Sequence, residues 1–242
     1  MADKTIKNPL RKRILRDIRK EKGKYISIFL FLTFMISIVS GMLVTSLSMM
    51  HTYDDGIETY KLEDGHFSTN SEISVADLQK IADQTDSGTA KATIYKQYFY
   101  NFDYTFEGNS NYSIRLYENR EALNTYSVFE GHAPEKDGEL AIDRLFAENN
   151  NLKIGDTLTF DGKDLTICGT VAVPDYSCLF ENNSDSMFSA TTFTTGFVTA
   201  DYFKEFSESK LTYSFAYHFS DRSLDDRASY DASTNLMNTL SK

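Results

Sequence analysis

One stretch of the chain differs from the rest in its pattern of apolar and polar residues. Residues Tyr25 to Met50 form a run of 26 residues without a charge, and 17 of them are Ile, Leu, Val, Phe or Met. A helix rises about 1.5 Å per residue, so this run would be about 39 Å long, more than the roughly 30 Å hydrocarbon core of a bilayer. The pattern predicts a transmembrane helix over residues 25–50.

A cleaved signal peptide is the alternative interpretation of this run. The apolar region of a signal peptide has about 7–15 residues and ends at small residues. The run in this chain is longer, and the segment Leu47–His51 at its end is a poor cleavage site. We therefore favour an uncleaved anchor.

The distribution of charge predicts the orientation of this helix. Residues 1–24 hold ten Lys and Arg against three acidic residues, a net charge of +7. The whole chain carries −10, so residues 25–242 carry −17. Lys and Arg beside a spanning helix stay on the cytoplasmic side. We expect a plasma-membrane protein with a cytoplasmic leader (1–24), a transmembrane helix (25–50) and an extracytoplasmic domain (51–242).

The basic leader has a helical pattern of its own. Asn8 and Pro9 are typical of a helix start, and Leu10, Ile14 and Ile18 follow at four-residue spacing among Lys and Arg. Such an amphipathic helix is suited to lie on anionic membrane lipids. The alternative is that the charges only set topology, and the same residues fit both interpretations.

The extracytoplasmic domain has the mixed pattern of an α+β fold. Residues 51–62 extend the membrane helix as a stalk. A strand at 65–69, a helix from Ser74 to about Gly88 and an aromatic strand at 91–107 suggest a β-α-β unit of ferredoxin-like type. The aromatic strand turns back into 112–118 as a hairpin. A small β-rich part follows, with strands at 139–143, 157–160 and 164–173, a helical turn at 144–150 and a turn at Gly155, and the chain ends in a helix at 229–240.

Histidines and cysteines are the candidate metal ligands, and their spacing in the sequence predicts no metal site. The four histidines, His51, His66, His132 and His218, are far apart. His66 lies near Glu63 and Asp64, but a solvated acidic loop explains that grouping more simply. An outward location would permit a disulfide between Cys168 and Cys178. Because Cys168 falls in a predicted buried strand, we favour two free thiols.

Other candidate chemistry is equally sparse. The sequence has no G-x-S-x-G elbow and no Ser-His-Asp constellation, so we predict no enzyme, no catalytic residues and no cofactor. Glycosylation sequons begin at Asn111 and Asn182, a pattern that is frequent by chance. The Tyr- and Phe-rich strand at 94–106 is expected to be sheet core rather than a binding surface. The acidic domain excludes nucleic acid as a partner, since phosphates require basic residues.

Four segments of the second half resemble a known family. They are Glu130–Pro134 (EGHAP), Gly138–Asp143 (GELAID), Leu152–Asp156 (LKIGD) and Leu165–Val171 (LTICGTV). Together they resemble the extracytoplasmic core domain of FtsX-like permeases, the MacB/LolC-type membrane subunits of ABC transporters. The resemblance is strong over residues 129–174, weaker over 51–128, and fits a position directly after a first membrane helix.

The resemblance implies a non-catalytic permease subunit that couples a cytoplasmic P-loop ATPase to export or extraction of a substrate at the outer membrane face. The chain itself has no G-x-x-x-x-G-K-[ST] phosphate loop. Family members have at least three further membrane helices, whereas this sequence ends at Lys242 within the outer domain, so further permease helices or a second permease subunit are implied partners. A single-pass, membrane-anchored binding or sensor module is the alternative function. The sequence specifies neither substrate nor direction of transport.

The charge asymmetry gives a test of orientation. With Cys168 replaced by Ala, we expect a membrane-impermeant thiol reagent to label Cys178 in intact cells, because the acidic part of the chain should lie outside. A denatured sample serves as the control that the thiol is free. Labelling that appears only after lysis would contradict the orientation.

Overall fold

The computed structural model describes residues 20–84, 91–106, 109–176, 180–181, 186–221 and 224–241. The chain divides into two compact units, Met1–Asp55 and Gly56–Lys242. We call the second of these the folded unit. The predicted amphipathic helix of the leader, around Leu10 to Ile18, lies outside the described residues and stays a prediction.

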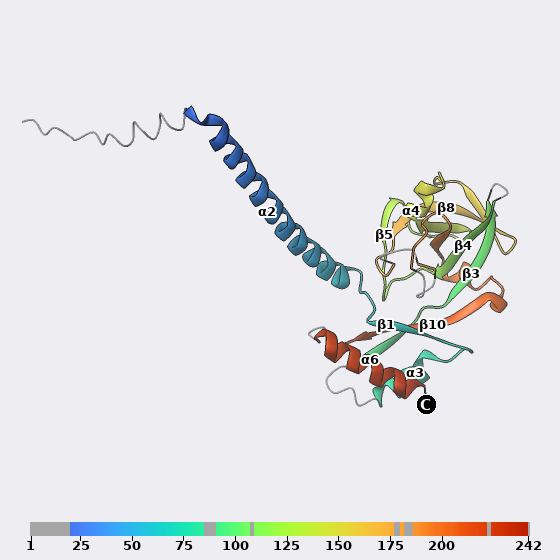
Figure 1. The fold of residues 1–242 in the computed structure, drawn as a ribbon. Coiled ribbons are helices and arrows are strands. Elements are labelled where there is room, and N and C mark those ends of the chain that lie inside the picture. The colour runs from blue at the N-terminus through green and yellow to red at the C-terminus, as the bar shows by residue number, and fades with distance from the viewer. Residues whose placement is uncertain are drawn as a thin grey trace, which may run out of the picture. The chain divides into compact units, whose positions relative to one another are not determined.

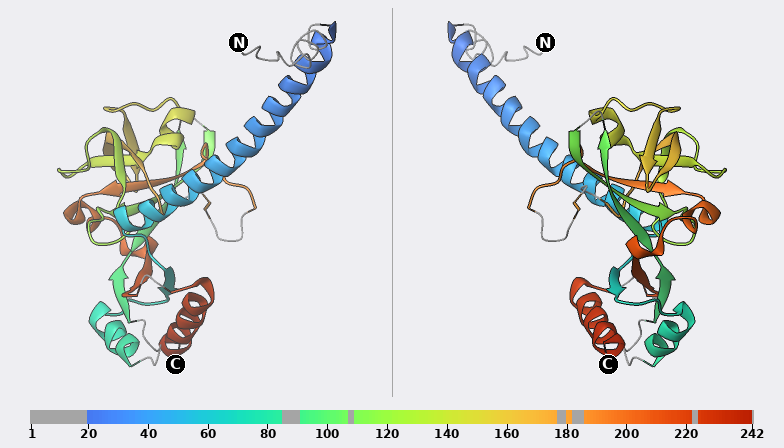
Figure 2. Two further views of the ribbon diagram at one scale, coloured as in Figure 1. Left: turned by 90° about the vertical axis from the view of Figure 1, so that its left-hand side faces the viewer. Right: turned by 90° about the vertical axis from the view of Figure 1, so that its right-hand side faces the viewer.

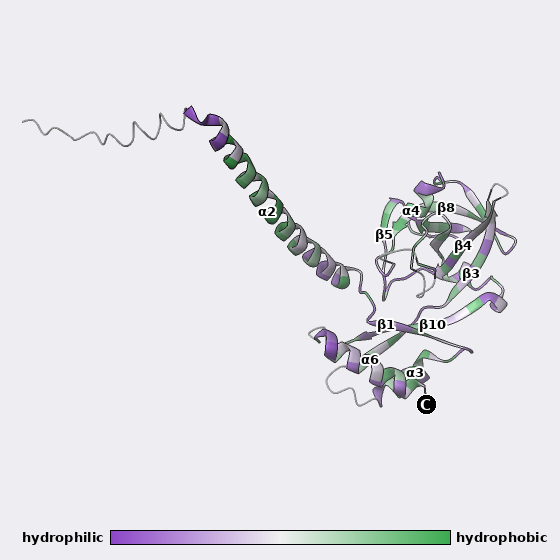
Figure 3. Ribbon diagram, in the orientation of Figure 1, coloured by the Kyte–Doolittle hydropathy of each residue, from purple (hydrophilic) through white to green (hydrophobic). Residues whose placement is uncertain are grey.

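A single long helix, α2 (Lys22–Thr59, 38 residues), contains the whole predicted membrane segment and most of the predicted stalk. At about 1.5 Å per residue it is about 57 Å long. None of its residues is buried, and its middle part is almost entirely apolar (Figure 3). The predicted helix is confirmed, and its length and composition are sufficient to cross a membrane.

The predicted β-α-β unit is also confirmed. It consists of β1 (Gly65–Thr69), α3 (Val75–Asp83) and β2 (Ala92–Lys96). Both strands pair antiparallel with β10 (Leu211–Phe219), which lies between them, as in the split β-α-β arrangement of ferredoxin-like folds. Ser74 caps α3 as expected, its hydroxyl accepting a hydrogen bond from the N–H of Ala76. The predicted continuation of this helix beyond residue 84 lies outside the described residues.

A second and larger part of the sheet follows (Figure 1). The predicted aromatic hairpin is β3 (Phe99–Phe106) with β4 (Asn109–Glu118). Beside β4 runs β9 (Phe193–Val198) in parallel, and then β6 (Glu139–Asp143). The remaining strand β8 (Lys163–Ala172) pairs with β6, β5 (Ser127–Gly131) and β7 (Thr157–Phe160).

The other helices after α3 are short except the last. They are α4 (Arg144–Asn149), α5 (Ala200–Phe203), the 3-10 turn η1 (Glu208–Lys210) and α6 (Asp226–Leu240). The last helix begins three residues before the predicted start because Asp225 caps it, accepting from the N–H of Ala228. Helices α3 and α6 lie side by side against the β1–β10–β2 strands (Figure 2).

Two sequence-based expectations about strands need correction. The aromatic segment 91–107 forms two strands rather than one, with a break at Gln97 and Tyr98. Both strands pair with β10, β2 along its last five residues and β3 at Leu211 and Thr212, and at the break the N–H of Gln97 still donates to the carbonyl of Ser214 at 2.9 Å. Strands β5, β9 and β10 were not predicted. Every residue of β9 is buried, so this strand has no alternation of apolar and polar residues to mark it.

The aromatic strand is core, as predicted. Tyr100, Phe102 and Tyr104 alternate with exposed residues and are buried. The Tyr100 ring centroid lies 4.8 Å from that of Phe203, and Tyr104 meets Phe160 edge-on at 4.9 Å. Ring pairs at these distances add stability beyond the apolar area they bury.

The predicted turn at Gly155 is confirmed. Gly155 has φ +97°, in the region that favours glycine. Its N–H donates to the carbonyl of Ile167 at 2.8 Å, and the carboxylate of Asp156 accepts from the N–H of Lys153 at 2.8 Å. The turn is therefore fastened to β8 on one side and closed by a side chain on the other.

This turn gives a stability test. We expect Gly155→Val to lower the free energy of unfolding by about 1–3 kcal/mol, because a β-branched residue is strained at this φ. A Cβ atom at Gly155 would contact nothing within 4 Å, so the loss isolates backbone strain. Denaturant unfolding of the full chain in detergent, followed by tyrosine emission, measures it.

Gly56→Ala is the matched control for this test. It also has open space around the added Cβ, but lies in α2, so it should be neutral or stabilising. Equal unfolding midpoints for Gly155→Val and the unmodified chain would refute the turn assignment.

Candidate functional site

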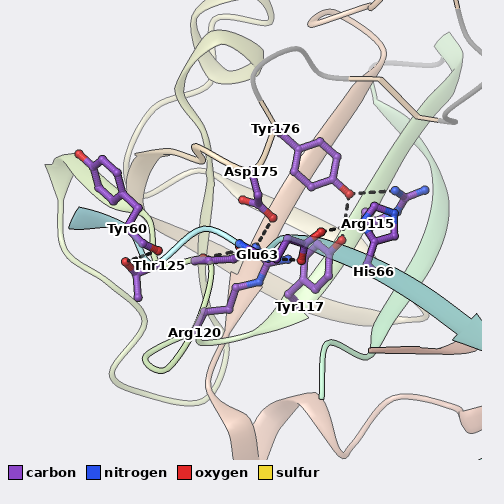
Figure 4. Close-up of polar contacts among 10 residues, drawn as sticks. Tyr60, Glu63, His66, Arg115, Tyr117, Arg120, Thr125, Asp175 and Tyr176 are labelled. Carbon is purple, nitrogen blue, oxygen red and sulfur yellow. Dashed lines mark hydrogen bonds and ion pairs between the residues drawn. The ribbon is translucent and has the colours of Figure 1, made fainter. Parts of the chain in front are cut away.

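A polar cavity of about 400 Å³ opens in the folded unit. Side chains from β1, β3, β4 and β10 line it together with the segments before β1 and after β8. Those that carry its chemistry come from parts of the sequence far from one another (Figure 4): Glu63, His66, Arg115, Tyr117, Arg120, Asp175 and Tyr176.

A buried ion pair forms one wall. Arg120 Nη1 lies 2.6 Å from Asp175 Oδ2, with the two side chains 5% and 10% exposed. The guanidinium lies 3.9 Å from the centroid of the Tyr117 ring. Burial acts to lower the pKa of Arg120, but Asp175, Tyr117 and Tyr176 together raise that pKa by more, so the guanidinium stays charged. Burial raises the pKa of Asp175 against the opposing effect of Arg120.

A second arginine organises the opposite wall. Arg115 donates from all three nitrogens: to Asn101 Oδ1 at 3.1 Å, to the Tyr176 hydroxyl at 2.9 Å and to the Glu181 carbonyl at 2.8 Å. The Tyr176 hydroxyl also lies 2.9 Å from that of Tyr117. Burial raises the pKa of Tyr117 well above its ordinary value, which keeps this phenol neutral. The Tyr176 hydroxyl thus links Arg115 to the phenol of Tyr117.

The third group consists of Glu63, His66 and Asn124. His66 Nδ1 lies 2.6 Å from Glu63 Oε1, and the other oxygen of Glu63 accepts from the side-chain amide of Asn124. The hydrogen bond to Glu63 raises the pKa of His66, which favours the imidazolium. The sequence predicted a solvated acidic loop here, but the structure places Glu63 in a defined hydrogen-bond group at the cavity.

The segment directly after α2 is fastened to the same region. The N–H of Thr125 donates to the carbonyl of Tyr60 at 2.9 Å, and the N–H of Asn124 donates to that of Lys61 at 3.0 Å. The Thr125 hydroxyl donates a second hydrogen bond to the carbonyl of Tyr60 (Figure 4). We call residues 60, 61, 124 and 125, all of them within the folded unit, the junction after α2.

The cavity offers both hydrogen-bond donors and acceptors to a ligand. Two of its buried polar atoms, Arg120 Nε and Asp175 Oδ1, have no hydrogen-bond partner among the described residues. His66 is hydrogen-bonded to the carboxylate of Glu63. This arrangement differs from the Ser–His or Cys–His pair of a nucleophilic enzyme. The site fits a small polar ligand with both donors and acceptors.

The other histidines have separate surroundings. His51 is exposed on α2, and His218 Nδ1 lies 2.9 Å from Asp64 Oδ2. The remaining one, His132, lies near Glu139 and Cys168, and one ligand atom from each falls within 4.8 Å of the other two. Spacing along the sequence gave no sign of this grouping, because pairing of β5 with β8 creates it.

The two ionisable groups beside His132, Glu139 and Cys168, have pKa values shifted in opposite directions. Backbone N–H groups of Glu135 and Lys136 lower the pKa of Glu139. Burial raises the pKa of the Cys168 thiol to about 11. Cys168 is a free cysteine, as predicted. Cys178 and the sequon residue Asn182 lie outside the described residues, as does the side chain of Asn111.

Comparisons with known proteins found no matching family model and no matching curated protein. Among solved structures, the chain is similar to the periplasmic region of MacB from Actinobacillus actinomycetemcomitans. The identity is 9%, the TM-score is 0.41, and the match covers 73% of this chain and 83% of the other.

It is similar to the same degree to the extracellular domain of the noncanonic ABC-type transporter YknZ from Gram-positive bacteria. Here the identity is 9%, the TM-score is 0.38, and the coverage is 73% and 94%. At TM-scores below 0.5 and at this identity, these similarities assign neither a family nor a function to the chain.

The buried ion pair gives the sharpest test of the cavity. We expect Arg120→Met to lower the free energy of unfolding by about 3–5 kcal/mol, because it leaves Asp175 buried without its countercharge. The double variant Arg120→Met/Asp175→Leu should recover most of that loss. Denaturant unfolding of the full chain in detergent measures both.

Lys204→Met is the matched control, since it breaks an exposed ion pair with Asp201. Its effect should stay below about 1 kcal/mol. A loss in Arg120→Met no greater than that in Lys204→Met would show that the Arg120–Asp175 pair is not buried.

Proposed function

We propose that this chain is the membrane-anchored, extracytoplasmic portion of an ABC transporter permease. In this function the chain hydrolyses no ATP, and a cytoplasmic P-loop ATPase supplies the energy for export or extraction of a substrate. Its N-terminus is cytoplasmic and its folded unit extracytoplasmic, in the cell membrane. The observation that carries the proposal is the family-like pattern over residues 129–174, placed in one folded unit that directly follows the membrane helix.

The local structure of that pattern supports this function. The four segments make β5, β6, β8 and the Gly155 turn, which pair with or bond to one another. The residues that carry the resemblance therefore build one substructure. A chance similarity of short segments gives no reason for them to meet in space.

The junction after α2 supports a coupling function. Tyr60 and Lys61 are hydrogen-bonded through their carbonyls to Thr125 and Asn124, at the edge of the polar cavity. Displacement of the chain at this junction strains those bonds and the linked Glu63–Asn124 contact. Such a contact is the kind of connection through which movement of a membrane helix reaches an outer domain.

Transport also needs more membrane helices than α2. A single apolar helix satisfies its own backbone and lines no path for cargo, and residues 25–50 contain no Asp, Glu, Lys, Arg or His that would mark one. We therefore propose further permease helices or a second permease subunit as partners. The basic leader contacts membrane lipids and lies where the ATPase docks.

A single-pass binding or sensor module is the second candidate function. The polar cavity favours it, because two unpartnered buried atoms and a hydrogen-bonded wall suit recognition of a small ligand. This function requires no ATPase, so the two candidates predict different partners.

Co-purification from the native membrane in mild detergent distinguishes them. We expect recovery of a P-loop ATPase with the chain, and its loss when Arg11, Arg13 and Arg16 are changed to Gln. The remaining Lys and Arg of the leader keep the positive-inside bias, so insertion should stay normal. Lys204→Gln/Lys210→Gln, on the folded unit, is the control that should retain the ATPase. Repeated recovery of the chain without any ATPase would favour the sensor.

A further inference from the structure

Three side chains with three different metal-ligating atoms meet beside β8. They are His132 after β5, Glu139 at the start of β6 and Cys168 within β8, with one ligand atom of each within 4.8 Å of the others. His132 Nδ1 lies 3.9 Å from Glu139 Oε2. An imidazole, a carboxylate and a thiolate are the donors that Zn²⁺ takes, and three protein ligands leave a fourth position for water.

The backbone is built to bring two of these residues together. A Cβ atom on Gly131 would lie 2.1 Å from the carbonyl oxygen of Cys168, and one on Gly169 would lie 2.4 Å from that of His132. Only glycines permit this approach, and the N–H of His132 donates across it to Cys168 at 3.2 Å. The ligands therefore stand on closely paired strands, which fix their positions before any ion arrives.

Surrounding hydrogen bonds hold the other two ligands in place. Glu139 Oε2 accepts from the N–H of Glu135 at 2.9 Å and of Lys136 at 3.1 Å, which holds the carboxylate beside His132. His132 Nδ1 lies 2.8 Å from the carbonyl of Ala133. If the metal binds Nε2, Nδ1 can keep its hydrogen bond to this carbonyl, as the second ring nitrogen of a ligand histidine usually does. If the metal binds Nδ1, it replaces that hydrogen bond.

The thiol completes the set. Cys168 is 5% exposed, and its Sγ lies 3.4 Å from the carbonyl of His132. Binding forms a bond from the metal to the thiolate and releases the thiol proton to solvent. The pair Glu63–His66 at the cavity has a carboxylate and an imidazole too, but no thiol among the described neighbours. It therefore provides an internal comparison.

We propose that His132, Glu139 and Cys168 form a binding site for Zn²⁺, with water as the fourth ligand. The ion would join the end of β5 to β6 and β8, within the substructure that carries the family-like pattern. This proposal is independent of the transporter function, because it concerns only the affinity of these three side chains for a cation.

Cobalt titration of the full chain in detergent tests the proposal. The protein carries Cys178→Ser, so that Cys168 is its one thiol, and is stripped of metal and kept reduced. We expect Co²⁺ to produce a thiolate-to-cobalt charge-transfer band in the near ultraviolet, with one equivalent bound, and Zn²⁺ to abolish it. Cys168→Ser should eliminate the band.

The other ligands separate a built site from binding to a thiol alone. Each of His132→Gln and Glu139→Gln should weaken Co²⁺ binding by at least about tenfold. Replacing even a residue that only supports a metal ligand lowers metal affinity by about that factor. Gln at 139 still accepts the backbone hydrogen bonds, and His132 is exposed, so both variants should fold. His66→Gln should leave the band unchanged. The proposal would be overturned if the Cys178→Ser protein gave no band. It would also be overturned if the His132→Gln and Glu139→Gln variants bound Co²⁺ as tightly as that protein does.

Discussion

The folded unit depends on one strand that bonds to both parts of its sheet. Strand β10 pairs with β3 through its first two residues and holds β1 and β2 on either side farther along. Since backbone N–H and C=O groups must be paired when they are buried, β10 sets where the β1–α3–β2 unit ends and the larger sheet begins. The break at Gln97 and Tyr98 lies where β10 passes from one part of the sheet to the other, and Gln97 also lines the cavity.

The cavity combines two arginines with the aromatic rings on which they lie. A buried ion pair such as Arg120–Asp175 adds little net stability because both groups lose their hydration. Loss of either partner would leave the other charge buried and unpaired, which is strongly destabilising. The hydroxyl of Tyr176 accepts from Arg115 and the carbonyl of Asn124 accepts from Arg120, so the loop after β8 and the junction after α2 are each hydrogen-bonded to an arginine of the site.

Much of the fold could be predicted from local signals. The charge-free run gives α2, Ser74 gives the start of α3, and Gly155 gives its turn, because each depends on residues adjacent in sequence. Strand β9 could not be predicted this way, since Thr194 and Thr195 are buried between two neighbouring strands. The cavity and the grouping around His132 could not be predicted from the sequence for a related reason. Arg120 and Asp175 are 55 residues apart, and His132 and Cys168 are 36 apart, so only pairing of the strands brings them together.

The wide spacing of β1 and β10 along the chain has a consequence for biosynthesis. Gly65 pairs with Tyr217, so the first strand is made about 150 residues before its partner. At a synthesis rate of about 5–20 residues per second, this interval lasts roughly 8–30 s. Throughout that time β1, α3 and β2 lack the strand between them, and their edges are open to pairing with other chains. The long separation of β1 from β10 therefore leaves two strand edges unpaired for most of the synthesis of the folded unit.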